Sequence, residues 1–128
     1  MNNFLRAVTM SAAVLVAGAC GPRTGSAPVP QADPVTVEVS NQNRRDVRVF
    51  VIRSGTPVRL GTVVSGRTGT FSYRGLQPGA SETLRIGAEV IGANANFSSE
   101  GVRVSPGDRV LLRLEDLIQS SSVSVRRP

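Results

Sequence analysis

The feature that most constrains the fold of this chain is an alternation of apolar and polar residues that begins at Val35. Val35, Val37 and Val39 alternate with polar residues, and the same period of two returns in residues 84–91, 102–104, 109–114 and 120–126. This period places successive side chains on opposite faces of a strand whose one face is buried. No window shows the apolar stripe of an amphipathic helix. The sequence therefore predicts an all-β domain over residues 35–128.

Turn signals separate these segments. They include the run from Asn41 to Asn43 and two Pro-Gly pairs, Pro78-Gly79 and Pro106-Gly107. Short strands at this spacing, about seven or eight in all, are typical of a small antiparallel β-sandwich. An immunoglobulin-like or transthyretin-like arrangement fits, with a small barrel as the alternative. True immunoglobulin kinship is not supported, because the chain has no Trp and only one Cys.

The N-terminus has the composition of an export signal. Arg6 is followed by an apolar run over residues 7–19. As a helix this run would reach roughly 20 Å, which is short of the ~30 Å hydrocarbon core that a membrane-spanning helix must cross. A charged start, a short apolar run and small residues at its end are typical of a secretory signal peptide. The small residues lead directly into Cys20, the only cysteine of the chain.

The segment from Ala17 to Cys20 resembles the lipobox of bacterial lipoproteins. That resemblance implies that residues 1–19 are removed and that Cys20 carries diacylglycerol and a further fatty acyl group such as palmitate. Gly21, in place of an Asp, implies the outer membrane rather than the inner one. Two or more acyl chains anchor a protein stably without a transmembrane helix. The alternative is an ordinary secretory signal that happens to be followed by a cysteine.

We expect residues 20–34 to comprise the lipidated cysteine that the resemblance implies and a Pro/Gly-rich tether, since the composition of this segment cannot build a core. With its anchor, linker and single β domain, the chain is similar to uncharacterised bacterial envelope lipoproteins. The strand block over residues 35–64 and the later segment 101–114 contribute to this likeness. The resemblance implies no activity, and only Cys20 acquires a role from it.

The charge of the domain comes from arginine. The 15 basic residues are all Arg, against 9 acidic residues, and the net charge is +6. Five arginines lie between apolar neighbours on expected strands and would face away from the core: Arg48, Arg59, Arg85, Arg103 and Arg113. They predict a basic stripe on one outer sheet face that could pair with phosphate groups. The alternative is a solvated face whose charges prevent aggregation through strand edges.

The residue inventory argues against catalysis. Without His or Lys, the chain lacks an imidazole base, a Schiff-base lysine and a Ser-His-Asp triad. The carboxylates are scattered, and neither a metal site nor a cofactor is expected. Tyr73 and Phe97 are the only candidate stacking rings, with ordinary packing as the alternative, whereas Phe50 is expected in the core. We therefore expect a protein that is not an enzyme.

Two functional hypotheses follow. The first is a lipid-anchored, non-catalytic protein-interaction or structural module that binds another envelope protein, or itself, through exposed strand edges. The second is the binding of anionic envelope ligands through the arginine face, namely lipopolysaccharide, phospholipid head groups or cell-wall polymer. A nucleic-acid partner is not expected at an envelope location, and the residues identify no small-molecule substrate.

The lipid anchor gives the first testable prediction. We expect the mature N-terminal peptide from the membrane fraction to begin at Cys20 and to have the mass of an acylated cysteine. The variant Cys20→Ser should lose both the added mass and the membrane association. An unmodified Cys20 in a soluble protein would contradict the lipoprotein hypothesis.

Overall fold

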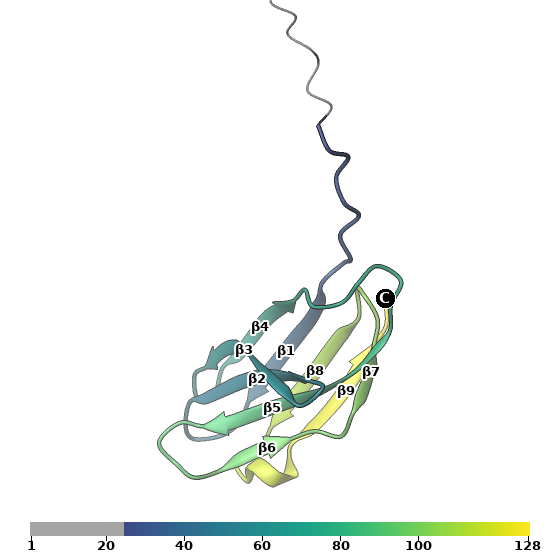
Figure 1. Cartoon of the computed structure of the whole chain (residues 1–128). Helices are drawn as coiled ribbons and strands as arrows, with labels where there is room; N and C mark the ends of the chain where they lie inside the picture. The colour runs from purple at the N-terminus through teal and green to yellow at the C-terminus, as the bar shows by residue number, and fades with distance from the viewer. Residues whose placement is uncertain (1–24) are drawn as a thin grey trace, which may run out of the picture.

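The computed structural model describes residues 25–128, and within them it is an all-β sandwich of nine strands with one short 3-10 turn (Figure 1). The predicted fold class is confirmed. Residues 25–34 form no helix or strand and lead directly into the first strand. The predicted signal segment and Cys20 lie outside the described residues.

The strands form two sheets that pack face to face. The four-stranded sheet has the spatial order β4 (Thr68–Tyr73), β1 (Val35–Asn41), β8 (Arg109–Leu114) and β9 (Ser122–Arg126). The five-stranded sheet has the order β3 (Thr56–Val63), β2 (Val47–Arg53), β5 (Glu82–Val90) and β6 (Asn96–Ser98), and β7 (Val102–Val104) also pairs with β5. The 3-10 turn η1 (Ile118–Ser120) precedes β9.

The sandwich is mostly antiparallel, but one strand pair departs from the sequence prediction. β1 and β8 run parallel, with Thr36 opposite Arg109 and Asn41 opposite Leu114. The alternation along a strand indicates which side chains are buried, but it contains no information on the direction of the neighbouring strand. A parallel pair needs a long crossover connection. Here that connection is nearly the whole domain, from the end of β1 to the start of β8.

The core is built from β-branched and aliphatic side chains that alternate along the strands. Every second residue of β1 and β2 points between the sheets, and β5 and β8 supply the opposing aliphatic groups. The most deeply buried side chains, each 1% exposed or less, include Val37, Val39, Val47, Val49, Val51, Leu84, Ile86, Val110 and Leu114. Branched side chains suit this position, because they pack well on a pleated surface.

The two Pro-Gly turns form as predicted. The Ala80 N–H donates to the Gln77 carbonyl at 3.1 Å, and the Asp108 N–H donates to the Ser105 carbonyl at 3.1 Å. The Asp108 carboxylate, itself buried, also accepts from the Ser105 N–H at 2.8 Å. Both turns lie at the end of the sandwich where residues 25–34 enter.

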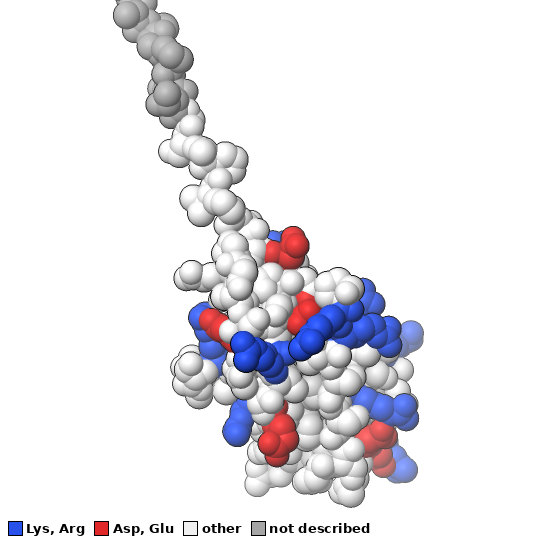
Figure 2. All heavy atoms as spheres, turned by 90° about the vertical axis from the view of Figure 1, so that its right-hand side faces the viewer, with Lys and Arg blue, Asp and Glu red and all other residues white. Residues whose placement is uncertain are grey.

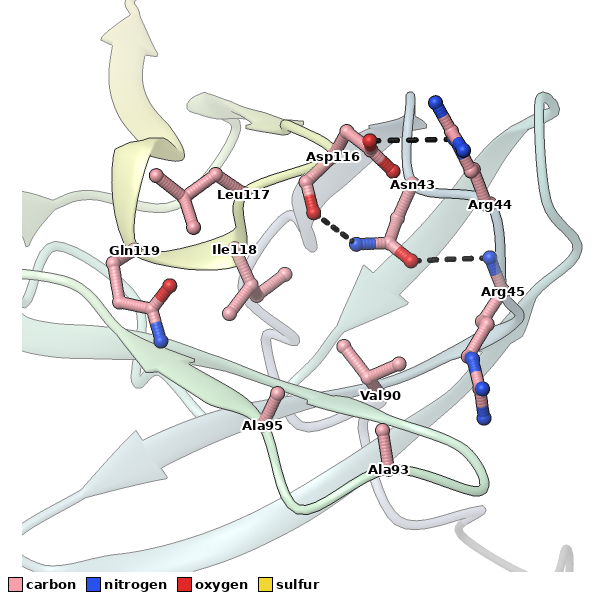
Figure 3. A pocket seen from close by; sticks show the side chains of 10 residues that line it. All are labelled: Asn43, Arg44, Arg45, Val90, Ala93, Ala95, Asp116, Leu117, Ile118 and Gln119. Carbon is pink, nitrogen blue, oxygen red and sulfur yellow. Dashed lines mark hydrogen bonds and ion pairs between the residues drawn. The ribbon is translucent and has the colours of Figure 1, made fainter.

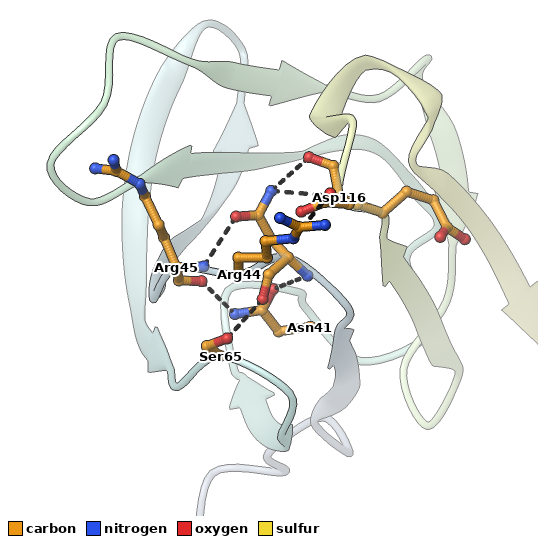
Figure 4. Close-up of polar contacts among 7 residues, drawn as sticks. Asn41, Arg44, Arg45, Ser65 and Asp116 are labelled. Atoms are coloured by element: carbon orange, nitrogen blue, oxygen red, sulfur yellow. Dashed lines mark hydrogen bonds and ion pairs between the residues drawn. The ribbon is translucent and has the colours of Figure 1, made fainter.

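At the opposite end, two buried asparagines join the loops (Figure 4). Asn41 is fully buried, and its Nδ2 donates to the carbonyls of Arg45 and Val63, both at 3.0 Å. Its Oδ1 accepts from the Asn43 N–H at 2.9 Å. The Asn43 Nδ2 in turn donates to the Asp116 carbonyl at 2.9 Å. The run that the sequence marks as a turn is therefore also the polar junction between the two sheets.

We expect Asn41→Ala to lower the free energy of unfolding by about 2–3 kcal/mol, because it removes the side-chain partner of one buried carbonyl, one part-buried carbonyl and one buried N–H. Gln42→Ala is the matched control: Gln42 is exposed and its side chain donates only to the Ser40 hydroxyl, so its replacement should cost less than about 0.5 kcal/mol. Urea unfolding followed by circular dichroism measures both. Equal midpoints for the two variants would show that the junction contributes nothing.

Candidate functional site

The outer surface of the five-stranded sheet gathers four of the five arginines singled out by the sequence. Arg48 lies on β2, Arg59 on β3, Arg85 on β5 and Arg103 on β7. The strand register places Arg59 opposite Phe50 and Arg85 opposite Ile52, on the side facing away from the core. We call the surface formed by these four arginines the basic face.

The fifth arginine does not belong to it. Arg113 lies on β8, in the four-stranded sheet, and points outward on the other side of the molecule. The expectation of a single stripe of five arginines is thus wrong for this residue. The period of two indicates that Arg113 faces solvent, but it does not reveal which sheet its strand joins.

An apolar hollow of about 350 Å³ lies on the same sheet face as the four arginines, and its one charged lining residue is Glu89, the partner of Arg48. Phe50, Ile52 and Pro57 line it together with the backbone of Gly87. The register explains this grouping, because Phe50 is opposite Gly87 on one side and Arg59 on the other, while Ile52 is opposite Pro57. Apolar groups with a few charged groups at the rim are the usual composition of a ligand site.

Gly87 is the reason why the sheet is hollowed here. It sits at the centre of β5, where any other residue would project a side chain outward between Phe50 and Ser98. A Cβ at this position would fall 3.2 Å from Ile52 Cδ1. Glycine in a strand interior weakens the strand, and it often marks a place where something approaches the backbone closely.

The basic face has more positive charge than its neighbours neutralise. Arg48 pairs with Glu89 at 3.3 Å, with side chains 36% and 51% exposed, which makes this pair worth only about 0–1 kcal/mol. The Arg59 Nη2 donates to the Thr62 hydroxyl at 3.2 Å. Within residues 25–128, neither Arg59, Arg85 nor Arg103 makes an ion pair. Three guanidinium groups are thus available to an anion.

The outer surface of the four-stranded sheet is chemically different. Its outward positions are mostly hydroxyl residues, namely Thr36, Ser40, Thr68, Thr70, Ser72, Ser122 and Ser124, and we call it the hydroxyl face. Two of its arginines are already paired, Arg109 with Glu38 at 3.6 Å and Arg113 with Glu115 at 2.6 Å. For Arg113, the alternative interpretation of a solvated, charge-paired residue therefore fits best.

The aromatic residues are arranged differently from the expectation. Tyr73, a candidate stacking ring, is 6% exposed and belongs to the core. Phe50, expected in the core, lies half-buried on the basic face. Phe97 is half-buried, packs against the core and borders the hollow. Phe50 lies two residues from Arg48 and therefore shares its outward face, but the apolar residues on both sides of Phe50 hide this pattern in the sequence.

A second hollow, of about 290 Å³, lies among the loops at the end of the sandwich away from residues 25–34 (Figure 3). Val90, Ala95 and Ile118 line it. Its basic side chains are already engaged: Arg44 pairs with Asp116 at 3.3 Å, and the Arg45 Nη1 donates to the Gly92 carbonyl at 2.6 Å. It therefore offers less unsatisfied charge than the basic face.

Other sources of function are limited in the part of the chain that the structure describes. Residues 25–128 contain no group of three metal-ligating side chains. None of their helical segments is long and apolar enough to cross a membrane. A scan against protein-family models finds no match for the sequence, and a search of curated proteins finds no relative. The functional argument therefore rests on the geometry of the faces.

We expect Gly87→Val to fill the hollow and weaken the binding of the anionic aromatic dye 1-anilinonaphthalene-8-sulfonate about fivefold or more. The flexible end of Ile52 can move aside, and valine favours strands, so the stability should change by no more than about 1 kcal/mol. Thr70→Val, which places the same side chain on the hydroxyl face, is the control. Dye titration and thermal unfolding measure the two effects, and an unchanged dye affinity in Gly87→Val would show that the hollow is not a binding site.

Proposed function

We propose that the chain is a lipid-anchored envelope protein, held through Cys20 on the outer rather than the inner membrane, and that its sandwich is a non-catalytic binding domain. The lipobox resemblance of residues 17–20 supports the anchor. Residues 25–34 support the tether, because they form no regular structure and are largely exposed. From Cys20 to the start of β1 the chain can extend to at most ~50 Å, which leaves the basic face within reach of the membrane surface.

The ligand that the geometry supports best is an anionic amphiphile of the envelope, such as a phospholipid or lipopolysaccharide. The observation that carries this proposal is the apolar hollow on the basic face, with Arg59 opposite Phe50 and Arg85 opposite Ile52, two of the residues that line it. A guanidinium group can donate two parallel hydrogen bonds to the oxygens of one phosphate, and the hollow offers an apolar surface to part of an acyl chain. A cell-wall polymer would use the arginines but would leave the hollow unused.

We expect Arg59→Gln combined with Arg85→Gln to weaken binding to vesicles of phosphatidylcholine with one quarter phosphatidylglycerol by about tenfold or more, because each charged contact contributes roughly 1 kcal/mol or more. Cys20→Ser is present in every variant, so that the anchor does not contribute. Binding by the parent should weaken as salt rises and should be slight on phosphatidylcholine alone.

The matched control is Arg109→Gln combined with Arg113→Gln, which removes the same charge from the hydroxyl face. It should change binding about twofold or less. If both double variants lose affinity equally, net charge alone explains binding and the basic face is not a site. If neither does, the anionic-lipid proposal fails.

The first sequence hypothesis, a module for protein interaction or self-association, stays a prediction. It needs an exposed strand edge, and the edges of this sandwich differ greatly in how open they are.

A further inference from the structure

The two sides of the sandwich close in different ways. On one side the chain passes directly from β3 to β4, and Phe71 fills the gap between the sheets. A Cβ on Gly61 would fall only 2.5 Å from the Phe71 ring, and one on Gly69 only 3.3 Å, so this side is tightly filled. On the other side β9 lies beside β7, yet these strands form no backbone pairing. A groove of about 280 Å³ remains there, lined by Phe97, Val102 and Val123 among others. We call it the seam groove.

β9 is the most receptive strand edge of the described domain. It pairs with β8 alone, in an uninterrupted register from Ser122 to Arg126, and it contains neither Pro nor Gly. β3, in contrast, contains Pro57 and lies at a bulge, and β6 and β7 have three residues each. β4 is regular, but it lies against β3 on the filled side. A regular edge with one free side is a template for a further strand.

The side chains around β9 indicate what that strand would contain. Val123 and Val125 are half-buried and pack against the core, so alternate positions of an added strand would meet apolar groups. On the outward surface, Arg126 stands directly opposite Arg109. Like charges at opposite positions of a strand pair are unfavourable. Arg109 is paired with Glu38 at 3.6 Å, whereas Arg126 makes no ion pair within residues 25–128, so a carboxylate on an added strand would meet Arg126.

The wider surface has the same sign. Figure 2 views the side of the molecule on which β9 and β7 lie, and it shows basic side chains gathered in a band across it. Glu100 is the one carboxylate among the residues that line the seam groove. A second copy of this chain, paired through its own β9, would add two more arginines to the same sheet face. The charge therefore favours an acidic partner over self-association.

We propose that the β9 edge is a docking site for an extended segment of a partner protein in which apolar residues alternate with Asp or Glu. The segment adds as a strand next to β9, with its apolar side chains toward the seam groove and its carboxylates beside Arg126. This site is separate from the basic face, and the inference does not depend on the lipid-binding proposal.

The probe is a synthetic nine-residue peptide of alternating Val and Glu, and a peptide of alternating Val and Lys is its control. We expect the first to bind the full chain and the second not to bind. Bound peptide should slow amide hydrogen exchange tenfold or more in β9, while β4, the other edge of the same sheet, should show no change.

Arg126→Glu tests the charge without endangering the fold, because it replaces a like-charge pair with an opposite-charge pair across from Arg109. It should weaken the acidic peptide at least tenfold and allow the basic peptide to bind. Arg59→Glu makes the same charge change on the basic face and should leave peptide binding unaltered, whatever it does to lipid binding.

Four outcomes would overturn the proposal. The acidic peptide could fail to bind, or it could slow hydrogen exchange in β4 or in all strands equally. Arg126→Glu could leave the affinity for the acidic peptide unchanged. Finally, hydrogen exchange in β9 could slow with rising protein concentration when no peptide is present. The last would identify a second copy of the chain as the occupant. Protection of β9 by phosphatidylglycerol vesicles in place of the peptide would assign the edge to lipid.

Discussion

The packing of alternating aliphatic side chains between the two sheets is the interaction on which everything else in this domain depends. Because Val37 and Val49 and their neighbours in register are buried, the residues between them must point to solvent. The outward positions are therefore fixed by the packing of the core, but the residue types at these positions can vary as long as the inward positions stay apolar. The burial of such side chains supplies the main favourable term in folding, since each fully buried Val or Leu contributes about 1.5–3 kcal/mol.

The domain uses this freedom differently on its two faces. One face is coated with hydroxyl groups, and two of its arginines, Arg109 and Arg113, are paired with Glu38 and Glu115. The other combines unmatched arginines with an apolar hollow at Gly87. An exposed apolar surface that borders uncompensated charge is unusual for a merely solvated sheet, whereas hydroxyls with paired charges are not. This difference, more than the net charge of the chain, distinguishes a candidate binding surface from an inert one.

The sequence predicted what depends on local periodicity and not what depends on strand partners. The alternation gave the fold class and the inward valines, and both Pro-Gly turns formed where expected. The prediction failed for Arg113, whose strand belongs to the other sheet, because no single segment of sequence determines which distant strand it pairs with. Phe50 was assigned to the core because its strand is apolar on both faces. The hollow could not be foreseen, since it arises only when β3, β2 and β5 bring Pro57, Phe50 and Gly87 side by side.

The position of β1 has a mechanical consequence. The strand that continues from residues 25–34 is not at an edge but lies between β4 and β8, with six register pairs on each side. A pull transmitted through the N-terminal segment runs along the axis of β1, so it loads the hydrogen bonds of both ladders in shear, all at once. An edge strand pulled along its axis in the same way would load one ladder only. Force applied to the N-terminal segment must therefore break two ladders, and not one, before β1 leaves the sheet.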